Sequence, residues 1–308
     1  QQLQHRRLGR QPGGEGEGVG GGGGVGGGGG VGGGGVSSLQ SVLLIGNSQL
    51  GPEEFHADFA AALEELSVAV DGDAHFTVDK VQENGQDCAG YVADGTGPGS
   101  PLERAGSGDY DVVILIPDLS EPTTGSLACF DTFRTTATNA GAAFGVMATA
   151  SFSGEYPQGF NTMHDGLRAY AVAHPGTLFV PAGKSWQIVL GTDTPSLEEL
   201  YALYSDLAHP GVRGYSLYLY TLWDVLHGAG TSSTGLTRDF PALRCDPSAG
   251  APACLTQAQL EQCAASGSCS STQNGVELDG NGDVAVTAAA QAALYQQAAD
   301  AAVAQSQP

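Results

Sequence analysis

The apolar positions of this chain form short unbroken runs that alternate with longer amphipathic segments. The short runs are rich in Val, Ile and Leu, which is typical of buried strands. Such runs are Ser41–Gly46, Tyr110–Ile116, Ala143–Thr149 and Thr177–Pro181, and the more polar segment His75–Val81 is a further strand candidate. The run at Tyr110–Ile116 (YDVVILI) is continuous, so we expect that strand to be covered on both faces.

Between these runs, apolar side chains recur with the period of a helix that buries one face. The first such segment is Glu53–Ser67, and further helices are predicted at Cys129–Ala140, Asn161–His174, Gly211–His227 and Thr287–Val303. Asp94–Gly108 is rich in Gly and Pro and predicts a loop. Strands that alternate with helices predict an α/β protein, in which a parallel sheet carries helices on both faces.

Residues that can carry chemistry interrupt this pattern at two places. Gly46-Asn47-Ser48 follows the first strand, and Asp206-Leu-Ala-His209-Pro210 precedes the strongly apolar helix. A strand, turn and helix would place the Ser48 hydroxyl at a helix N-terminus and at the carboxyl end of a parallel strand, where oxyanions and ligands bind. A serine needs a base and the base needs an orienting group, so Ser48, His209 and Asp206 are nominated as nucleophile, base and orienter.

Each of these residues also has a plainer interpretation. Ser48 could simply cap a helix, His209 could be a solvated loop side chain, and Asp206 could cap the following turn. Their occurrence together, in the order that an α/β sheet requires, favours the functional interpretation. No pair of histidines has metal-ligand spacing, and no metal or cofactor is predicted.

The N-terminal region differs in composition from the rest of the chain. Residues 11–36 are almost only Gly with spaced Val and two Glu, which buries too little apolar surface to offset the entropy of ordering. We therefore expect residues 1–40 to be a disordered, Gly-rich tail. Gln1 is not an initiator Met, which is consistent with a removed signal peptide or a trimmed fragment, and no signal-type or membrane-spanning apolar stretch is visible.

The chain is strongly acidic, with 33 Asp and Glu against 11 Lys and Arg and a formal charge of −22. Such a surface repels nucleic acid and anionic membranes, because phosphate binding needs clustered Lys and Arg. It favours an extracellular or high-salt setting and a small-molecule partner over nucleic acid. The oligomeric state is left open.

Six cysteines are present and none forms a CxxC pair. They are Cys88, Cys129, Cys245, Cys254, Cys263 and Cys269. The last four crowd a segment with few apolar residues, which favours a loop stapled by disulfides in an oxidising compartment. Their pairing cannot be read from the sequence; Cys88 with Cys129 is the remaining pair if the other four close among themselves.

The motifs around Ser48 and His209 resemble the SGNH/GDSL hydrolases, in the branch whose first block reads G-N-S. The matching pieces are Val42–Ser48 (VLLIGNS), Tyr110–Ile116 and Leu203–Trp223, which carries D-x-x-H-P. This resemblance implies a three-layer α/β/α sandwich with a mostly parallel, flavodoxin-like sheet. It implies a serine esterase in which Ser48 attacks, His209 acts as base and then acid, and Asp206 orients the imidazole.

The resemblance also implies an oxyanion hole, which the chain matches only in part. The Ser48 N–H would be one donor and a glycine of the second block another, for which Gly99 is the first choice and Gly97 the alternative. The third block should offer an amide side chain just after the third strand, yet the chain reads Pro117-Asp118-Leu119-Ser120 there. Loss of one such donor costs about 10²–10³ in rate.

Two functions therefore stay open. The first is a secreted esterase for small acyl esters, with carbohydrate O-acetyl esters as one substrate class. The second is a catalytically impaired protein that uses the same fold for binding or at a surface. In either case residues 41–228 form the hydrolase-like domain, and residues 229–308 add a Cys-containing loop and a helix that packs on it. The aromatic residues Phe152, Tyr156 and Trp186 could form a substrate platform or belong to the core.

Overall fold

A computed structural model of the chain describes residues 40–50, 58–72, 75–121, 127–191, 194–195, 203, 208–228, 230 and 289–307. Its five strands lie close to the predicted runs. They are β1 (Gln40–Gly46), β2 (Phe76–Gln82), β3 (Val112–Leu115), β4 (Ala143–Met147) and β5 (Leu178–Val180). The prediction of an apolar strand for each run is confirmed.

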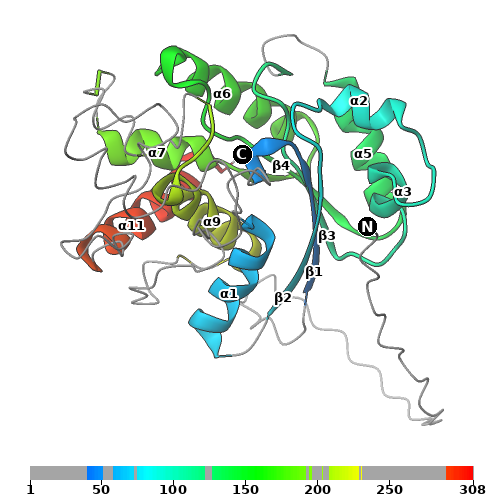
Figure 1. Cartoon of the computed structure of the whole chain (residues 1–308), viewed down its shortest axis with the longest axis horizontal. Helices are drawn as coiled ribbons and strands as arrows, with labels where there is room; N and C mark the ends of the chain where they lie inside the picture. The colour runs from blue at the N-terminus through cyan, green and yellow to red at the C-terminus, as the bar shows by residue number, and fades with distance from the viewer. Residues whose placement is uncertain are drawn as a thin grey trace, which may run out of the picture. The chain divides into compact units, whose positions relative to one another are not determined.

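The strands form one parallel sheet with the order β2-β1-β3-β4-β5 (Figure 1). β1 lies between β2 and β3, with Ile45 opposite Val81 on one side and Leu115 on the other. Every strand pair is parallel, so all carboxyl ends meet at one edge of the sheet. The α/β/α architecture is thereby confirmed.

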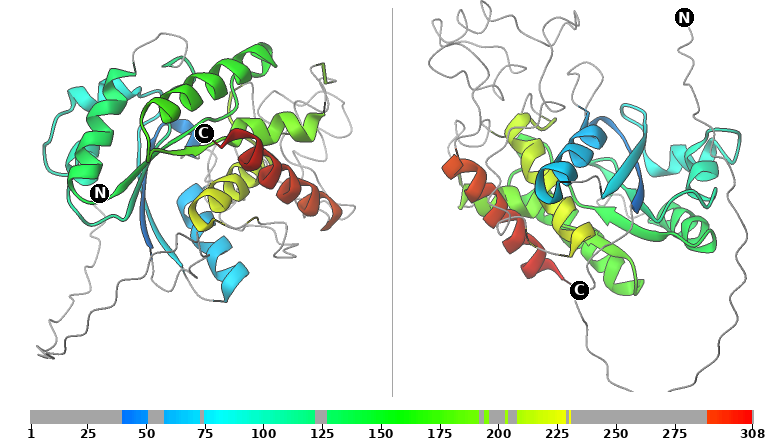
Figure 2. Two further views of the ribbon diagram at one scale, coloured as in Figure 1. Left: turned by 180° about the vertical axis from the view of Figure 1, so that it is seen from behind. Right: turned by 90° about the horizontal axis from the view of Figure 1, so that it is seen from below.

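Helices cover both faces of this sheet (Figures 1 and 2). Their bounds are α1 (Phe59–Asp71), α2 (Cys88–Ala93), α3 (Pro101–Ala105), α5 (Ala128–Asn139), α6 (Gln158–Ala173), α7 (Ala182–Leu190), α9 (Val212–His227) and α11 (Ala289–Ser306). Side chains of β1 alternate between two cores: Val42 and Leu44 pack toward α1 and α9, whereas Leu43 and Ile45 pack toward α2 and α5.

The first helix begins later than the sequence predicts. Asp58 has an extended backbone and its side chain accepts hydrogen bonds from the N–H groups of Ala60 and Ala61, so it caps a helix that starts at Phe59. At the other end Gly72 adopts a left-handed conformation, φ 80°, and its N–H donates to the Val68 carbonyl. The capping aspartate, rather than the apolar spacing that begins at Phe55, determines where α1 starts.

Three short helices were not predicted. α3 lies within Asp94–Gly108, where Ser100 caps the N-terminus and Pro101 occupies the first turn. α2 begins after Asp87, whose side chain accepts from Gly90 N–H. α7 follows β5 directly. The prediction of a loop over Asp94–Gly108 is therefore wrong at Pro101–Ala105, because a capped Ser-Pro start outweighs the surrounding glycines.

The closing helix α11 packs on the domain, as predicted. Its residues Tyr295, Ala298 and Ala299 are buried in the same core as α9. This explains why α9 is apolar almost all round: one side faces the sheet and another faces α11, so Leu217, Leu219 and Leu222 are fully buried.

Several predictions lie outside the described residues. These are the N-terminal tail (residues 1–39), the position of Asp206 and the four cysteines from Cys245 to Cys269. Among the described helices, none is both long enough and apolar enough to cross a lipid bilayer.

Candidate active site

Ser48 lies at the carboxyl end of β1 and opens a single turn of 3₁₀ helix (Ser48–Leu50). The strand can approach its neighbour this closely because it ends on glycine: a Cβ at Gly46 would lie 2.9 Å from the Cβ of Ile116. The turn is held by Asn47, whose Oδ1 accepts a hydrogen bond from the Gln49 N–H at 3.0 Å. The local sequence thus places the serine at the predicted edge of the sheet.

The structure brings Ser48 and His209 together across 161 positions of the chain. The Nε2 atom of His209 lies 2.7 Å from Ser48 Oγ, which is hydrogen-bond distance for a base and a hydroxyl nucleophile. Both side chains are half-buried. The pair therefore has the geometry that proton transfer from serine to imidazole requires.

A second hydrogen bond joins the same two segments. Gln49 follows the nucleophile, is 3% exposed, and donates from Nε2 to the Ala208 carbonyl at 3.0 Å. Ala208 directly precedes His209, so this bond links the backbone of the imidazole to the turn of Ser48. From α9, the Tyr215 hydroxyl donates to the Ser48 carbonyl at 3.3 Å. Sequence reasoning missed Gln49, whose partner lies 159 positions away.

Asp206, the predicted orienting carboxylate, is outside the described residues. The described site consequently contains two members of the predicted trio. The role of Asp206 stays a prediction.

The predicted oxyanion glycine, Gly99, lies on the exposed loop between α2 and α3. Its φ is +82°, and its N–H donates to Glu103 Oε2 at 3.2 Å. Another glycine, Gly85, lies in the turn that directly follows β2, with φ +72°. Because β2 pairs with β1, and the Glu83 N–H donates to the Gly46 carbonyl at 3.3 Å, this turn lies beside the carboxyl end of β1. The Asn84-Gly85 pair, directly after the strand, is the feature of the sequence that could have indicated this turn.

The segment after β3 offers a carboxylate where the resemblance implies an amide. Asp118 Oδ1 accepts from both the N–H and the hydroxyl of Ser120, at 3.0 and 2.7 Å. The Asp118 N–H donates to Glu121 Oε2 at 2.7 Å. Asp118 is thus engaged in its own turn and presents no side-chain donor to the site.

Comparison of the complete sequence with protein-family models and with curated proteins gives no match. Solved structures are similar in fold. A DUF4886 family protein from Bacteroides uniformis matches with a TM-score of 0.52 and 11% identity, over 66% of this chain and 88% of that one. TesA matches with a TM-score of 0.44 and 18% identity, over 61% and 98%. An acetylxylan esterase from Geobacillus stearothermophilus, Axe2, matches with a TM-score of 0.43 and 17% identity, over 62% and 95%.

The strand order, the serine at the end of β1 and its contact with His209 agree with the resemblance found in the sequence. The fold is the predicted three-layer α/β/α sandwich around a parallel sheet.

Near the serine site, Glu121 joins the segment after β3 to α2. It is 6% exposed, and its Oε1 accepts from the Cys88 N–H at 2.8 Å. Burial raises the pKa of the Glu121 carboxyl to about 7, against the lowering effect of its two backbone hydrogen bonds. The group is therefore partly neutral near neutral pH.

Cys88 and Cys129 lie at disulfide distance, with 2.23 Å between the sulfur atoms, and connect α2 to α5. This is the pair that remains if the other four cysteines pair among themselves. Together with Glu121 they are the only group among the described residues in which three possible metal ligands lie within 4.8 Å of one another. Sulfur atoms joined in a disulfide are not thiolates, so the paired form offers a metal only the carboxylate.

The three aromatic residues considered as a substrate platform lie in different surroundings. Trp186 is fully buried in the core, and Tyr156 packs edge-on against Phe160. Phe152 is 43% exposed and follows β4 at the same edge of the sheet as Ser48. A joint platform is not formed, because Trp186 belongs to the core.

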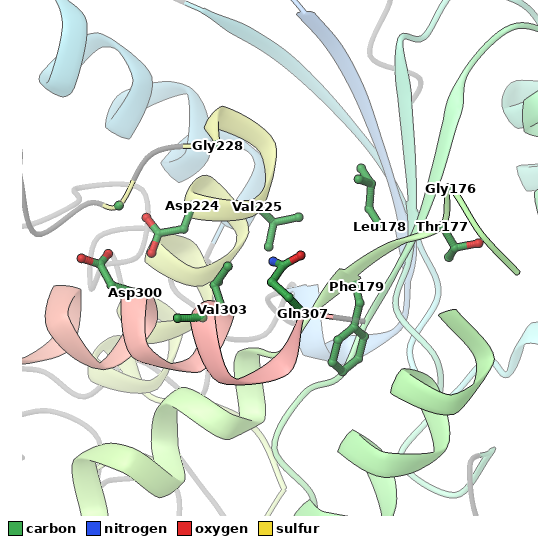
Figure 3. Close-up of a pocket in the computed structure, with 12 residues that line it drawn as sticks. Gly176, Thr177, Leu178, Phe179, Asp224, Val225, Gly228, Asp300, Val303 and Gln307 are labelled. Carbon is green, nitrogen blue, oxygen red and sulfur yellow. The ribbon is translucent and has the colours of Figure 1, made fainter. Parts of the chain in front are cut away.

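A cavity of about 620 Å³ lies elsewhere, between β5, α9 and α11 (Figure 3). Asp224 and Asp300 approach each other across it from α9 and α11, and Gly176 and Thr177 border it just before β5. These residues mark the amino edge of the sheet, opposite to the edge that carries Ser48. The cavity is therefore separate from the serine site.

Proposed function

We propose that the protein is a serine ester hydrolase in which Ser48 is the nucleophile, His209 the general base and acid, and Asp206 the orienting carboxylate. The observation that carries this proposal is the 2.7 Å contact between His209 Nε2 and Ser48 Oγ at the carboxyl edge of a parallel sheet. A hydroxyl is a weak nucleophile until a base accepts its proton, and imidazole is suited to that role near neutral pH.

In the proposed reaction, Ser48 Oγ attacks the ester carbonyl while its proton passes to His209 Nε2. The protonated imidazole then gives this proton to the leaving alcohol as the tetrahedral intermediate collapses to an acyl-enzyme. Water, deprotonated by the same nitrogen, attacks the acyl group and releases the acid. As the second tetrahedral intermediate collapses, His209 returns this proton to Ser48 Oγ, so both side chains end the cycle in their starting state.

The oxyanion requires N–H donors close to Ser48. The Ser48 N–H is one. For a second backbone donor the sequence nominates Gly99, but its N–H is directed to Glu103. We favour Gly85, because its turn follows β2 and β2 runs beside β1.

We propose a small acyl ester as substrate, with carbohydrate O-acetyl esters as one class. The charge of −22 favours an uncharged substrate over an anionic one. The acidic surface and the Cys88–Cys129 pair also support an extracellular or secretory setting. The alternative, a protein that binds esters without turnover, is favoured by one observation: Asp118 stands after β3 where an amide donor is expected.

Hydrolysis of 4-nitrophenyl acetate tests the proposal. We expect turnover by the wild-type protein, loss of at least about 10³-fold in Ser48→Ala, and labelling of Ser48 by a fluorophosphonate. Ser107→Ala is a matched control, since Ser107 lies before β3 at the other edge of the sheet. Absence of both turnover and labelling in the wild type would reject the esterase and favour the binding protein.

A further inference from the structure

Asn47, the residue before Ser48, has a buried hydrogen-bond donor that no described residue accepts. Asn47 is 2% exposed, and its Nδ2 is without a hydrogen-bond partner among the described residues. A buried donor left unpaired loses its hydrogen bonds to water without replacement, so native proteins rarely retain one without a reason. Buried polar groups without a partner are expected mainly at functional sites, where a ligand can supply the missing hydrogen bond.

The orientation of this amide is fixed by the other half of the side chain. Oδ1 accepts from the Gln49 N–H at 3.0 Å. A flipped amide would direct its NH₂ group toward that N–H and lose the bond, so the hydrogen-bond pattern assigns the oxygen to Gln49 and leaves the nitrogen unpaired.

The segment that follows β3, one of the two strands beside β1, offers no side-chain donor next to Ser48. Ile45 lies opposite Leu115, and the Ile116 N–H donates to the Ile45 carbonyl at 2.7 Å. Continuing this register places Pro117 and Asp118 opposite Asn47 and Ser48. Proline has no N–H, and the Asp118 carboxylate accepts hydrogen bonds but, when ionised, donates none. Side-chain amides flank Ser48 on both sides in the sequence. That of Gln49 donates to the Ala208 carbonyl, whereas the Asn47 Nδ2 has no hydrogen-bond partner among the described residues.

We propose that Asn47 Nδ2 is a side-chain donor of the oxyanion hole, beside the Ser48 N–H. This proposal rests on the esterase function of Ser48. Among the described residues the amide nitrogen has no acceptor, and in this proposal it gains one when the ester carbonyl becomes an oxyanion. Such a donor stabilises the transition state without stabilising the ground state equally, which raises kcat.

Asn47→Asp is the sharpest test. An aspartate keeps an oxygen for the Gln49 N–H, so the turn can form, but it replaces the donor with a negatively charged oxygen. We expect kcat for 4-nitrophenyl acetate to fall by about 10²–10³ or more, with little change in KM. Labelling of Ser48 by a fluorophosphonate should slow in parallel, because the phosphonyl oxygen occupies the same position. Asn161→Asp is the matched control; its Oδ1 accepts from Gln187 at 2.9 Å.

A crystal structure of the wild-type protein phosphonylated at Ser48 provides a second measurement that needs no variant. The Asn47 Nδ2 should lie about 2.7–3.2 Å from the phosphonyl oxygen. A separation beyond hydrogen-bond reach, or an Asn47→Asp variant that folds and keeps kcat within about threefold of the wild type, would overturn the role of Asn47 and leave the esterase proposal standing. A wild-type protein without Ser48-dependent hydrolysis would reject both proposals.

Discussion

Gln49 offers a direct test of how the two halves of the site are held together. Its side chain is buried and donates to the Ala208 carbonyl, next to His209, while its Oε1 has no hydrogen-bond partner among the described residues. We expect Gln49→Leu to impair hydrolysis more than it impairs folding. The substitution removes the bond that positions the histidine segment, and it also removes a buried, unpaired oxygen.

The size of the effect follows from the energy of one buried hydrogen bond. Loss of a partner in such a bond costs about 1–3 kcal/mol. If that energy serves to hold His209 against Ser48 in the transition state, kcat should fall by about 5- to 150-fold. The free energy of unfolding should change by less than about 1 kcal/mol, because eliminating the unpaired Oε1 offsets part of the loss.

The assay compares kcat, KM and urea unfolding in Gln49→Leu and in Gln187→Leu. Gln187 is a close match, since its Nε2 donates to Asn161 and its Oε1 is also without a hydrogen-bond partner among the described residues. A positioning role requires kcat to fall in the Gln49 variant alone. Gln49→Glu should also lose activity, since an ionised carboxylate cannot donate to the Ala208 carbonyl. Equal kcat in all of these proteins would refute the reasoning.

Two further predictions concern stability. In Gly183→Ala the new Cβ would lie 2.4 Å from the Thr149 carbonyl oxygen, so we expect a loss of about 1–3 kcal/mol, measured as a lower urea midpoint, whereas Gly97→Ala meets no atom within 4 Å and should be neutral. Burial raises the pKa of Glu121 from the usual 4.5 to about 7, so the neutral form is the one that folding favours. Stability should therefore fall as the pH rises from about 4.5 through about 7, by up to ~3 kcal/mol, and Glu121→Gln should abolish this decline. An unchanged pH profile of unfolding in Glu121→Gln would contradict the assignment.

The strands and longer helices could be predicted because local pattern and final packing agree. Val112–Ile116 is apolar throughout, and β3 is buried on both faces. The short helices were beyond prediction from periodicity: α3 spans Pro101–Ala105 and depends on the Ser100 cap and on packing against α5, not on its own apolar pattern.

The contact between Ser48 and His209 was predictable for a different reason. Ser48 and His209 stand directly beside recognisable elements, so the topology of a parallel sheet brings them together. The supporting contacts are not visible in the sequence. Gln49 reaches Ala208 only after folding, and the choice between Gly85 and Gly99 depends on which turn adjoins β1.

These contacts suggest that the site is organised before any substrate arrives. The Gly46 carbonyl accepts from the Tyr91 hydroxyl at 2.5 Å, and burial raises the pKa of that hydroxyl, so it stays a donor. The Ser48 carbonyl accepts from Tyr215 on the opposite face of the sheet. The turn is thus fixed through α2 on one face and α9 on the other. Its main-chain acceptors are occupied, whereas the Asn47 amide nitrogen has no acceptor within the part of the chain that the structure describes. Such a turn is suited to stabilise a negative charge that develops during the reaction. Its acceptors are held in place and the Asn47 Nδ2 donor is available, so no reorganisation is needed when the charge appears.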